Sequence, residues 1–320
     1  MKLKSNLSSS MNILITGGNG MLGKNLLEHV TSQMFSIFTP TSEELNLLDS
    51  EQIKSYLKIY QINFIIHCAG VVGGIQANIA NPVKFLNENL SIGMNLVNSA
   101  FKVGICQFLN VGSSCMYPKD YVNPLKESYL LQGLLEPTNE AYALAKITVA
   151  KLCEYYAQQY SLSYKTVIPC NLYGRWDKFS DQYSHMLPAV IKKMYFAKEN
   201  NLSVVDVWGG GQARREFMYA GDCADAIWFC VDQFETMPQY VNIGLGVDYS
   251  IIQYYQAVAK VLNYHAAFKH DLSKPEGMKQ KLVDNSMLRN LGWQANHSLA
   301  EGVSKTIDFY KKEVLCTTQK

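Results

Sequence analysis

The sequence has little net charge, no long run of one charge and no hydrophobic run long enough to cross a membrane. Its 320 residues carry a formal net charge of +2, and only 18% of them are Asp, Glu, Lys or Arg. Lys and Arg never stand more than two in a row, so neither nucleic acid nor a membrane surface is expected as the main partner. The apolar segments have the length of strands and core helices rather than of membrane spans.

Disulfide and metal frameworks are also missing. The eight cysteines show no CxxC spacing and mostly stand in apolar segments. Such cysteines are typical of reduced thiols in a cytoplasmic protein, and no metal site is expected. The first ten residues, MKLKSNLSSS, lack the apolar core of a signal peptide, and we expect residues 1–10 to form a flexible tail.

What the sequence does contain is a strict alternation of apolar strands with amphipathic helices. Strands are expected within 12–16, 34–40, 63–70 and 106–114, and helices after residue 20, within 42–60 and over 83–104. Parallel strands need helical crossovers, which bury both faces of the sheet. The order therefore predicts an α/β fold, a Rossmann-type doubly wound parallel sheet.

The alternation loosens after about residue 175, which indicates a second, smaller unit. We expect an NADP-binding domain over 11–176, with return segments near 218–254 that include QYVNIGLG. The segments 177–217 and 255–316 are expected to form a discontinuous α/β substrate-binding lobe, with a helix near 186–199.

Three glycines follow the first expected strand in a GxxGxxG pattern, Gly17, Gly20 and Gly23. A turn without side chains lets the backbone approach a pyrophosphate, and the helix that begins there offers free N–H groups. A glycine-rich turn without any ligand is the alternative. The second strand ends in FTPTSEE, which has no carboxylate before Glu43. This favours NADP over NAD, although no arginine follows to hold the 2′-phosphate.

Tyr142 and Lys146 stand four residues apart in the helical segment NEAYALAK, so they share one helix face. An ammonium close to a phenol favours the phenolate, which suits proton exchange with a substrate oxygen. About one such pair among the twenty tyrosines is expected by chance. A catalytic role for this pair is favoured because a glycine turn begins the chain and Ser113 ends an earlier strand. Together they describe a ketone reductase site, in which Ser113 hydrogen-bonds the carbonyl oxygen, Tyr142 protonates it and Lys146 tunes the tyrosine.

Finer motifs extend this pattern over most of the chain. In order they are AGVVGGIQAN at 69–78, GSSCMYP at 112–118, LLEPTNEAYALAK at 134–146, PCNLYG at 169–174, SHMLPAVIKK at 184–193, VWGGGQARREF at 207–217 and SKPEGMKQKL at 273–282. From about residue 12 to 310 the sequence resembles the GDP-L-fucose synthase family of extended short-chain dehydrogenase/reductases. The resemblance implies an NADP-dependent enzyme that epimerises C3 and C5 of GDP-4-keto-6-deoxy-D-mannose and reduces C4 to give GDP-L-fucose. It also implies a homodimer, for which the helices over 83–104 and 140–161 are the candidate interface.

Epimerisation, unlike reduction, calls for Cys115 and His185. Inverting a carbon beside a carbonyl removes a proton from one face and returns one to the other, so two proton carriers must flank the sugar ring. A thiol and an imidazole both titrate near neutrality. The resemblance implies Cys115 as the base and His185 as the acid. Without the resemblance, a cysteine in an apolar stretch is more often a packing residue. A lone histidine is hardly better evidence of a catalytic role.

The resemblance also implies two sets of binding residues. The set for the GDP-sugar is Lys193, Trp208, Arg215 and Glu276, and Arg215 is the leading candidate for the diphosphate because arginine can grip phosphate oxygens with two donors. The set for the cofactor is Gly17, Gly18, Asn19, Gly20, Met21, Leu22, Gly23, Asp49, Ala69, Gly70, Ser113, Lys146, Pro169, Asn171, Leu172 and His185.

Departures from the family pattern keep other readings open. The first glycine turn has GGNG in place of GHRG, and Pro40 and Ser42 stand where arginine is common, so both departures fall in the pocket of the 2′-phosphate. Similar enzymes act on GDP-4-keto-6-deoxy heptoses or on colitose precursors, and some reduce without epimerising. The rival hypotheses are a C4 reductase of a GDP-keto-heptose and a non-catalytic nucleotide-sensing protein on the same fold.

Overall fold

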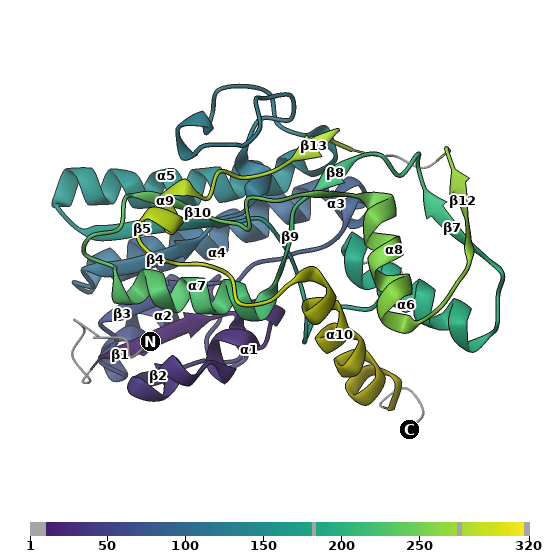
Figure 1. Ribbon diagram of the computed structural model, residues 1–320. Coiled ribbons are helices and arrows are strands. Elements are labelled where there is room, and N and C mark those ends of the chain that lie inside the picture. The colour runs from purple at the N-terminus through teal and green to yellow at the C-terminus, as the bar shows by residue number, and fades with distance from the viewer. Residues whose placement is uncertain (1–10, 181–183, 274–276, 317–320) are drawn as a thin grey trace.

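Six parallel strands form the central sheet of the computed structural model, which describes residues 11–180, 184–273 and 277–316 (Figure 1). The order across the sheet is β10 (Tyr240–Ile243), β5 (Ser163–Pro169), β4 (Gln107–Val111), β3 (Phe64–His67), β1 (Asn12–Thr16) and β2 (Ser36–Phe38). Every neighbouring pair is parallel, which confirms the predicted Rossmann-type sheet. The predicted tail, residues 1–10, lies outside the described residues.

Side chains that alternate along the strands divide the core into two layers. Ile13 and Ile15 of β1 are fully buried in a cluster with α1 (Met21–Glu28) and α7 (Ala220–Asp232). Leu14, between them, belongs to a second cluster with α2 (Ser50–Ile59), α4 (Pro82–Lys102) and α5 (Glu140–Tyr160). Because both faces of the sheet are covered, most side chains of its inner strands are buried and apolar.

A smaller group of elements lies beside the sheet, on the right in Figure 1. Its core is formed by α6 (Met186–Glu199), α8 (Ile251–Leu262) and α10 (Leu299–Phe309). Short strand pairings complete it: β7 (Val204–Trp208) is parallel to β12 (Ala267–Asp271), and β8 (Arg214–Arg215) lies between β11 (Tyr249–Ser250) and β13 (Gln280–Lys281).

Several segments join this group to the sheet. The parallel pair of β6 (Asn171–Tyr173) and β9 (Phe217–Tyr219) links them, α3 (Ile75–Ala80) follows β3, and α9 (Ser286–Asn290) lies near β10. The segment QYVNIGLG returns to the sheet as β10, as predicted. Val283, Leu288 and Trp293, which stand in the expected substrate-binding segment 255–316, pack in the same core cluster as the sheet. The division into two domains remains a prediction.

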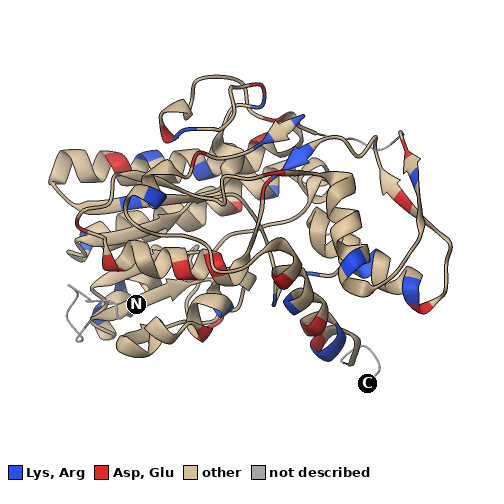
Figure 2. Ribbon diagram, in the orientation of Figure 1, with Lys and Arg blue, Asp and Glu red and all other residues tan. Residues whose placement is uncertain are grey.

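None of the described helices is both long and apolar enough to span a membrane. All eight cysteine thiols are free. Acidic and basic residues are interspersed along the ribbon, and no face of one sign is seen in this view (Figure 2). The even distribution agrees with the low net charge of the sequence.

Candidate active site

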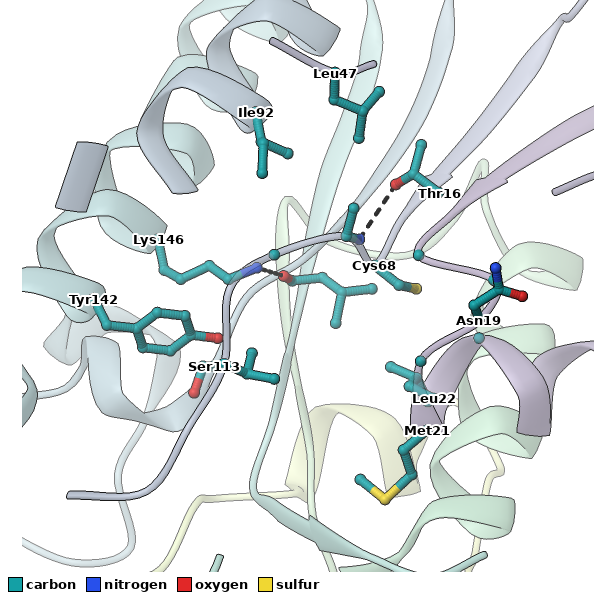
Figure 3. A pocket seen from close by; sticks show the side chains of 18 of the residues that line it. Thr16, Asn19, Met21, Leu22, Leu47, Cys68, Ile92, Ser113, Tyr142 and Lys146 are labelled. Atoms are coloured by element: carbon teal, nitrogen blue, oxygen red, sulfur yellow. Dashed lines mark hydrogen bonds between the residues drawn. The ribbon is translucent and has the colours of Figure 1, made fainter. Parts of the chain in front are cut away.

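The carboxyl ends of β1, β3 and β4 open into a cavity of about 600 Å³ (Figure 3). Parallel α/β sheets bind ligands at this edge, because loops and helix N-termini converge there. The walls come from the glycine turn, from the loops within 40–48, 68–73 and 111–113, and from the side chains of Tyr142, Lys146 and His185. All residues that the sequence assigned to a cofactor line this cavity except Asp49.

The glycine turn is as tight as its pattern predicts. Gly17 has φ +74°, in the left-handed region that glycine tolerates, and the Gly20 N–H donates to the Gly17 carbonyl at 2.9 Å. A Cβ on Gly23 would stand 2.2 Å from the Gly17 oxygen. Gly20 caps α1 without a side-chain hydrogen bond. The first residues of α1 therefore present their amides and the positive end of the helix dipole to the cavity.

Replacing Gly23 with alanine is expected to remove dinucleotide binding. The added methyl group would push the Gly17 carbonyl and the start of α1 apart, because the obstacle is backbone and cannot turn aside. We expect at least a hundredfold weaker binding of a nicotinamide dinucleotide in calorimetric titration, about 3 kcal/mol. Gly20→Ala, whose Cβ would lie 3.3 Å from the same oxygen, should be milder. Wild-type affinity in Gly23→Ala would contradict the assignment of this turn.

The loop after β2 forms the wall where a cofactor ribose would lie. Pro40, Thr41 and Ser42 line it, while the Glu44 carboxylate turns back to accept a hydrogen bond from the Thr41 amide at 2.8 Å. The lining residues of this loop offer hydroxyls but neither a cation nor a carboxylate. They do not repel a 2′-phosphate, and they do not grip it as arginine does. Asp49 caps α2 by accepting from two amides of its first turn.

Several buried polar side chains, which sequence reasoning missed, form hydrogen bonds that fix the backbone at the base of the cavity. The Thr16 hydroxyl lies 2.8 Å from Nδ1 of His67 and accepts from the Ala69 amide at 3.3 Å. Burial, aided by a nearby lysine, lowers the pKa of His67 to about 3, so the neutral ring can accept from the hydroxyl. The Asn89 amide holds both backbone groups of Val71. A polar residue within an apolar strand or helix is the sequence feature that could have indicated Thr16, His67 and Asn89.

Ser113, Tyr142 and Lys146 meet on the opposite wall of the cavity (Figure 3). Ser113 follows β4 and caps a short 3-10 turn over Ser114–Met116. Tyr142 and Lys146 stand one turn apart on α5, and the Lys146 ammonium lies 5.9 Å from the centre of the Tyr142 ring. The ammonium donates to the Val111 carbonyl at 3.0 Å. The phenol and the Ser113 side chain are neighbours at the cavity wall, so both can reach one substrate oxygen.

The charge state of Tyr142 differs from the sequence-based expectation. Burial, followed by the nearby Cys115, raises the pKa of Tyr142, and burial lowers the pKa of Lys146. The phenol is therefore protonated in the structure instead of being shifted toward the phenolate by the lysine. A protonated phenol is the form that can donate to a developing alkoxide.

Cys115 lies deeper than Ser113, in the 3-10 turn that follows it. Its side chain is 5% exposed and packs in the core of the sheet without lining the cavity. Burial raises the pKa of the Cys115 thiol, while Ser113, Lys281 and Lys146 act to lower it. The thiol is protonated at rest, but two buried cations favour its thiolate. Lys281 lies in the motif SKPEGMKQKL, two residues after the exposed Lys279, and sequence reasoning did not single it out.

His185 enters the cavity at the N-terminus of α6. His185 is exposed where it lines the open cavity, while many protein atoms surround its ring. Burial, followed by Lys281 and Lys178, lowers the pKa of His185 to about 4. The imidazole is therefore neutral at pH 7 in the absence of a bound anion.

The expected GDP-sugar residues lie on the elements of the smaller group. The Lys193 ammonium lies 5.7 Å from the centre of the Trp208 ring and donates to a backbone carbonyl of β7 at 2.9 Å. Arg215, on β8, is paired in register with Lys281 of β13. Glu276 lies outside the described residues. The structure thus brings Lys193 and Trp208 together and places Arg215 next to Lys281.

A protein-family model matches residues 13–244, and its description is the NAD dependent epimerase/dehydratase family. The chain belongs to this family. Epimerase/dehydratase-family relatives match almost the whole chain. A GDP-L-colitose synthase of Yersinia pseudotuberculosis is 54% identical over 304 residues, 95% of this chain and 99% of that protein. A GDP-L-fucose synthase of Azorhizobium caulinodans is 43% identical over 298 residues, 93% of this chain and 96% of that protein.

Solved structures of similar enzymes have the same fold. A GDP-D-glycero-L-gluco-heptose synthase from Campylobacter jejuni, in the presence of NADPH, has a TM-score of 0.88 and 28% identity and covers 96% of this chain and 100% of that one. A GDP-mannoheptose C4 reductase from Campylobacter jejuni with NADP bound has a TM-score of 0.86 and 29% identity, with the same coverage. The chain is thus an enzyme with a Rossmann-type fold, in a family of nicotinamide-dependent epimerases and reductases.

The cavity of this epimerase/dehydratase-family enzyme suits a nicotinamide dinucleotide. A Cβ on Gly17 would stand 2.8 Å from the Ala69 nitrogen, and one on Gly18 would stand 2.8 Å from the Thr39 Cβ. The bare backbone therefore leaves room that side chains would fill. The amides at the start of α1 suit a pyrophosphate, and Lys146 stands at the far end of the same cavity, beside Tyr142.

Proposed function

We propose that this enzyme binds NADPH and a GDP-4-keto-6-deoxy sugar, epimerises the sugar next to its ketone and reduces the ketone at C4. The observation that carries the proposal is the shared cavity, in which the glycine turn, Ser113, Tyr142, Lys146 and His185 meet. Relatives named as synthases of GDP-L-colitose and GDP-L-fucose support the choice of sugar. An NADP-bound neighbour supports the choice of cofactor.

In the reduction, bound NADPH supplies the hydride that adds to C4. Ser113 donates a hydrogen bond to the carbonyl oxygen, which gains negative charge as the hydride arrives. Tyr142, which burial keeps protonated, then gives its proton to that oxygen. Lys146 lies close enough to stabilise the resulting phenolate.

In the epimerisation, the ketone acidifies the hydrogens on the adjacent carbons. Cys115 lies two residues after Ser113 and just outside the cavity lining, and the proposal requires its thiol to reach the sugar and remove one of these protons. The ketone oxygen takes up the electron pair as an enolate, and Ser113 and Tyr142 stabilise that oxygen. His185 returns a proton to the opposite face of the carbon. Because its pKa lies near 4, the imidazole must first gain a proton, and the negative charge of a bound diphosphate favours this gain.

Two hexoses are the candidate substrates, and one assay separates them. The sequence resemblance predicts GDP-4-keto-6-deoxy-D-mannose, which yields GDP-L-fucose. The relative with 54% identity favours the analogue without the 3-hydroxyl, because L-colitose is L-fucose lacking that group. We expect NADPH oxidation with both ketones and about tenfold higher kcat/KM for the 3-deoxy ketone. If folded protein oxidised NADPH with neither ketone, the proposed function would be wrong.

A C4 reductase of a GDP-keto-heptose remains the second candidate. The solved neighbours from Campylobacter jejuni favour it, at 28% and 29% identity. A heptose carries one more hydroxymethylene group than the hexoses, so kinetics with matched hexose and heptose ketones distinguish the two. The lower identity of these neighbours makes the hexose the first choice.

The proposal also covers the residues that bind GDP and the assembly of two subunits. Lys193, Trp208, Arg215 and Glu276 are proposed to hold the GDP part of the substrate, with the Trp208 ring, which is 47% exposed, available to stack on guanine. We also propose a cytoplasmic homodimer that joins α4 and α5 of two subunits. These helices pack together and expose apolar side chains such as Leu144 and Tyr155.

A further inference from the structure

A buried carboxylate, that of Glu216, lies where the chain passes from the smaller group of elements to the sheet. Glu216 stands between β8 and β9 and is 0% exposed. Strand β8 pairs with β11 and β13, and β9 pairs with β6 (Figure 1). No step of the proposed reaction uses this side chain. A carboxylate is costly to bury unless the protein supplies hydrogen bonds to it, so its partners indicate what it holds in place.

Both oxygens of this carboxylate accept hydrogen bonds from backbone amides of distant segments. Oε1 accepts from Leu245 at 2.5 Å and from Gly246 at 2.8 Å, in the loop after β10. Oε2 accepts from Val283 at 3.0 Å, two residues beyond β13. A Cβ on Gly244 would stand 2.7 Å from Oε1, so glycine at that position leaves room for the carboxylate. One side chain thus ties the loop after β10 to the segment after β13.

The backbone of the same residue is bonded to a wall of the catalytic cavity. Its carbonyl accepts from the Asn171 side-chain amide at 2.8 Å, and Asn171 lines the cavity. Its amide donates to the Lys281 carbonyl of β13 at 3.2 Å. The preceding residue is Arg215, whose carbonyl accepts from the Tyr254 hydroxyl of α8 at 2.8 Å. Residue 216 therefore connects β6, β8, β13 and the loop after β10.

These connections join the two ends of the site that a bound GDP-sugar would span. Arg215, proposed to hold the diphosphate, is at one end, and the cavity wall that contains Asn171 is at the other. The sugar ketone can meet Tyr142 only if the separation of these ends is correct. A misplacement of about 1 Å can lower a rate about a hundredfold. GDP alone would occupy only the first end and a dinucleotide only the second, so the binding of either does not depend on the separation.

We propose that Glu216 is a positioning residue, which fixes the distance between Arg215 and the catalytic cavity so that the ketone of a bound GDP-sugar lies at Tyr142. The inference rests on the proposed function. Because Glu216 is fully buried, it meets neither substrate nor cofactor and takes no part in bond making. Its contribution is to hold four segments in one arrangement.

The test compares Glu216→Gln with the matched control Asp222→Asn. Glutamine keeps the length of the side chain but replaces one acceptor oxygen with an NH₂ group, which then faces a backbone amide that can only donate. Asp222 is also a buried carboxylate, 1% exposed, and accepts from the amides of Asn296 and His297. It lies outside the lining of the catalytic cavity. Both variants lose hydrogen bonds of a buried carboxylate, so both should unfold at a lower temperature.

The readouts separate positioning from binding and from stability. Below the unfolding midpoint of each variant, we expect a single turnover of NADPH oxidation at saturating keto-sugar to slow about tenfold or more in Glu216→Gln. The affinities for GDP and NADPH in calorimetric titration should be unchanged, and Asp222→Asn should keep the wild-type rate. A wild-type rate in Glu216→Gln, or weaker GDP binding with a normal rate, would overturn the inference. An equal loss of rate in Asp222→Asn would assign the effect to stability and also overturn it.

A second variant, Glu216→Asp, replaces Glu216→Gln if that protein does not fold. Aspartate keeps the carboxylate but shortens the side chain by one methylene group, so its oxygens cannot reach all three amides. We expect a slower turnover with unchanged GDP affinity, and a wild-type rate would overturn the inference. If the folded wild type oxidised no NADPH with any keto-sugar, the proposed function itself would be refuted.

Discussion

Tyr142→Phe is expected to lower the rate of C4 reduction by about a thousandfold, within the range measured for loss of a general acid. The phenylalanine ring fills the same space on α5, so the cavity keeps its shape. Only the proton donor disappears, and the alkoxide at C4 then has no acid beside it. Stopped-flow measurement of NADPH oxidation in a single turnover isolates this step from product release.

The control for Tyr142→Phe is Tyr155→Phe on the same helix. Tyr155 is 55% exposed and lies outside the cavity lining, so its hydroxyl should not affect the rate. NADPH affinity should be unchanged in both variants, because neither removes part of the glycine turn. If Tyr142→Phe kept more than about a tenth of the wild-type rate, another group would have to be the proton donor.

Cys115→Ser is expected to separate the two halves of the reaction. A serine hydroxyl fits the same buried turn but is far less acidic than a thiol, so proton removal from carbon should fall by about a hundredfold or more. Reduction at C4 keeps Ser113, Tyr142 and Lys146 and should continue on the ketone that has not been epimerised. NMR spectra of the product would then show the configuration of the starting sugar at C5.

The thiol control is Cys106→Ser, because Cys106 is exposed and remote from the cavity lining. It should give the same product as the wild type. A normal L-configured product from Cys115→Ser would mean that the buried thiol only fills the core. The C4 reductase of a GDP-keto-heptose would then be the better hypothesis.

The sequence predicts the part of the site that follows from local patterns. Gly17, Gly20 and Gly23 form a strand-to-helix turn, Ser113 ends a strand, and Tyr142 and Lys146 share a helix face. Each of these features lies within a few residues of a strand or helix end that periodicity can locate. A parallel sheet then brings such ends to one edge, so the cavity could be anticipated without coordinates.

The rest of the site depends on contacts between distant segments. Lys281 is buried although it stands in the polar segment SKPEGMKQKL, and a lysine in a polar stretch gives no sign of burial. Burial also decides the charge states, since it raises the pKa of Tyr142 against the expected effect of Lys146. Burial likewise raises the pKa of Cys115 and lowers that of His185. No sequence pattern measures how much protein surrounds a group.

One NMR experiment tests the central claim, that a single cavity moves a hydride to C4 and protons at the neighbouring carbon. The wild-type enzyme is given GDP-4-keto-6-deoxy sugar and NADPH in heavy water. We predict an L-configured product with hydrogen from the cofactor at C4 and deuterium from the solvent at C5. A reduced product that keeps the D configuration and its original hydrogen at C5 would contradict the account.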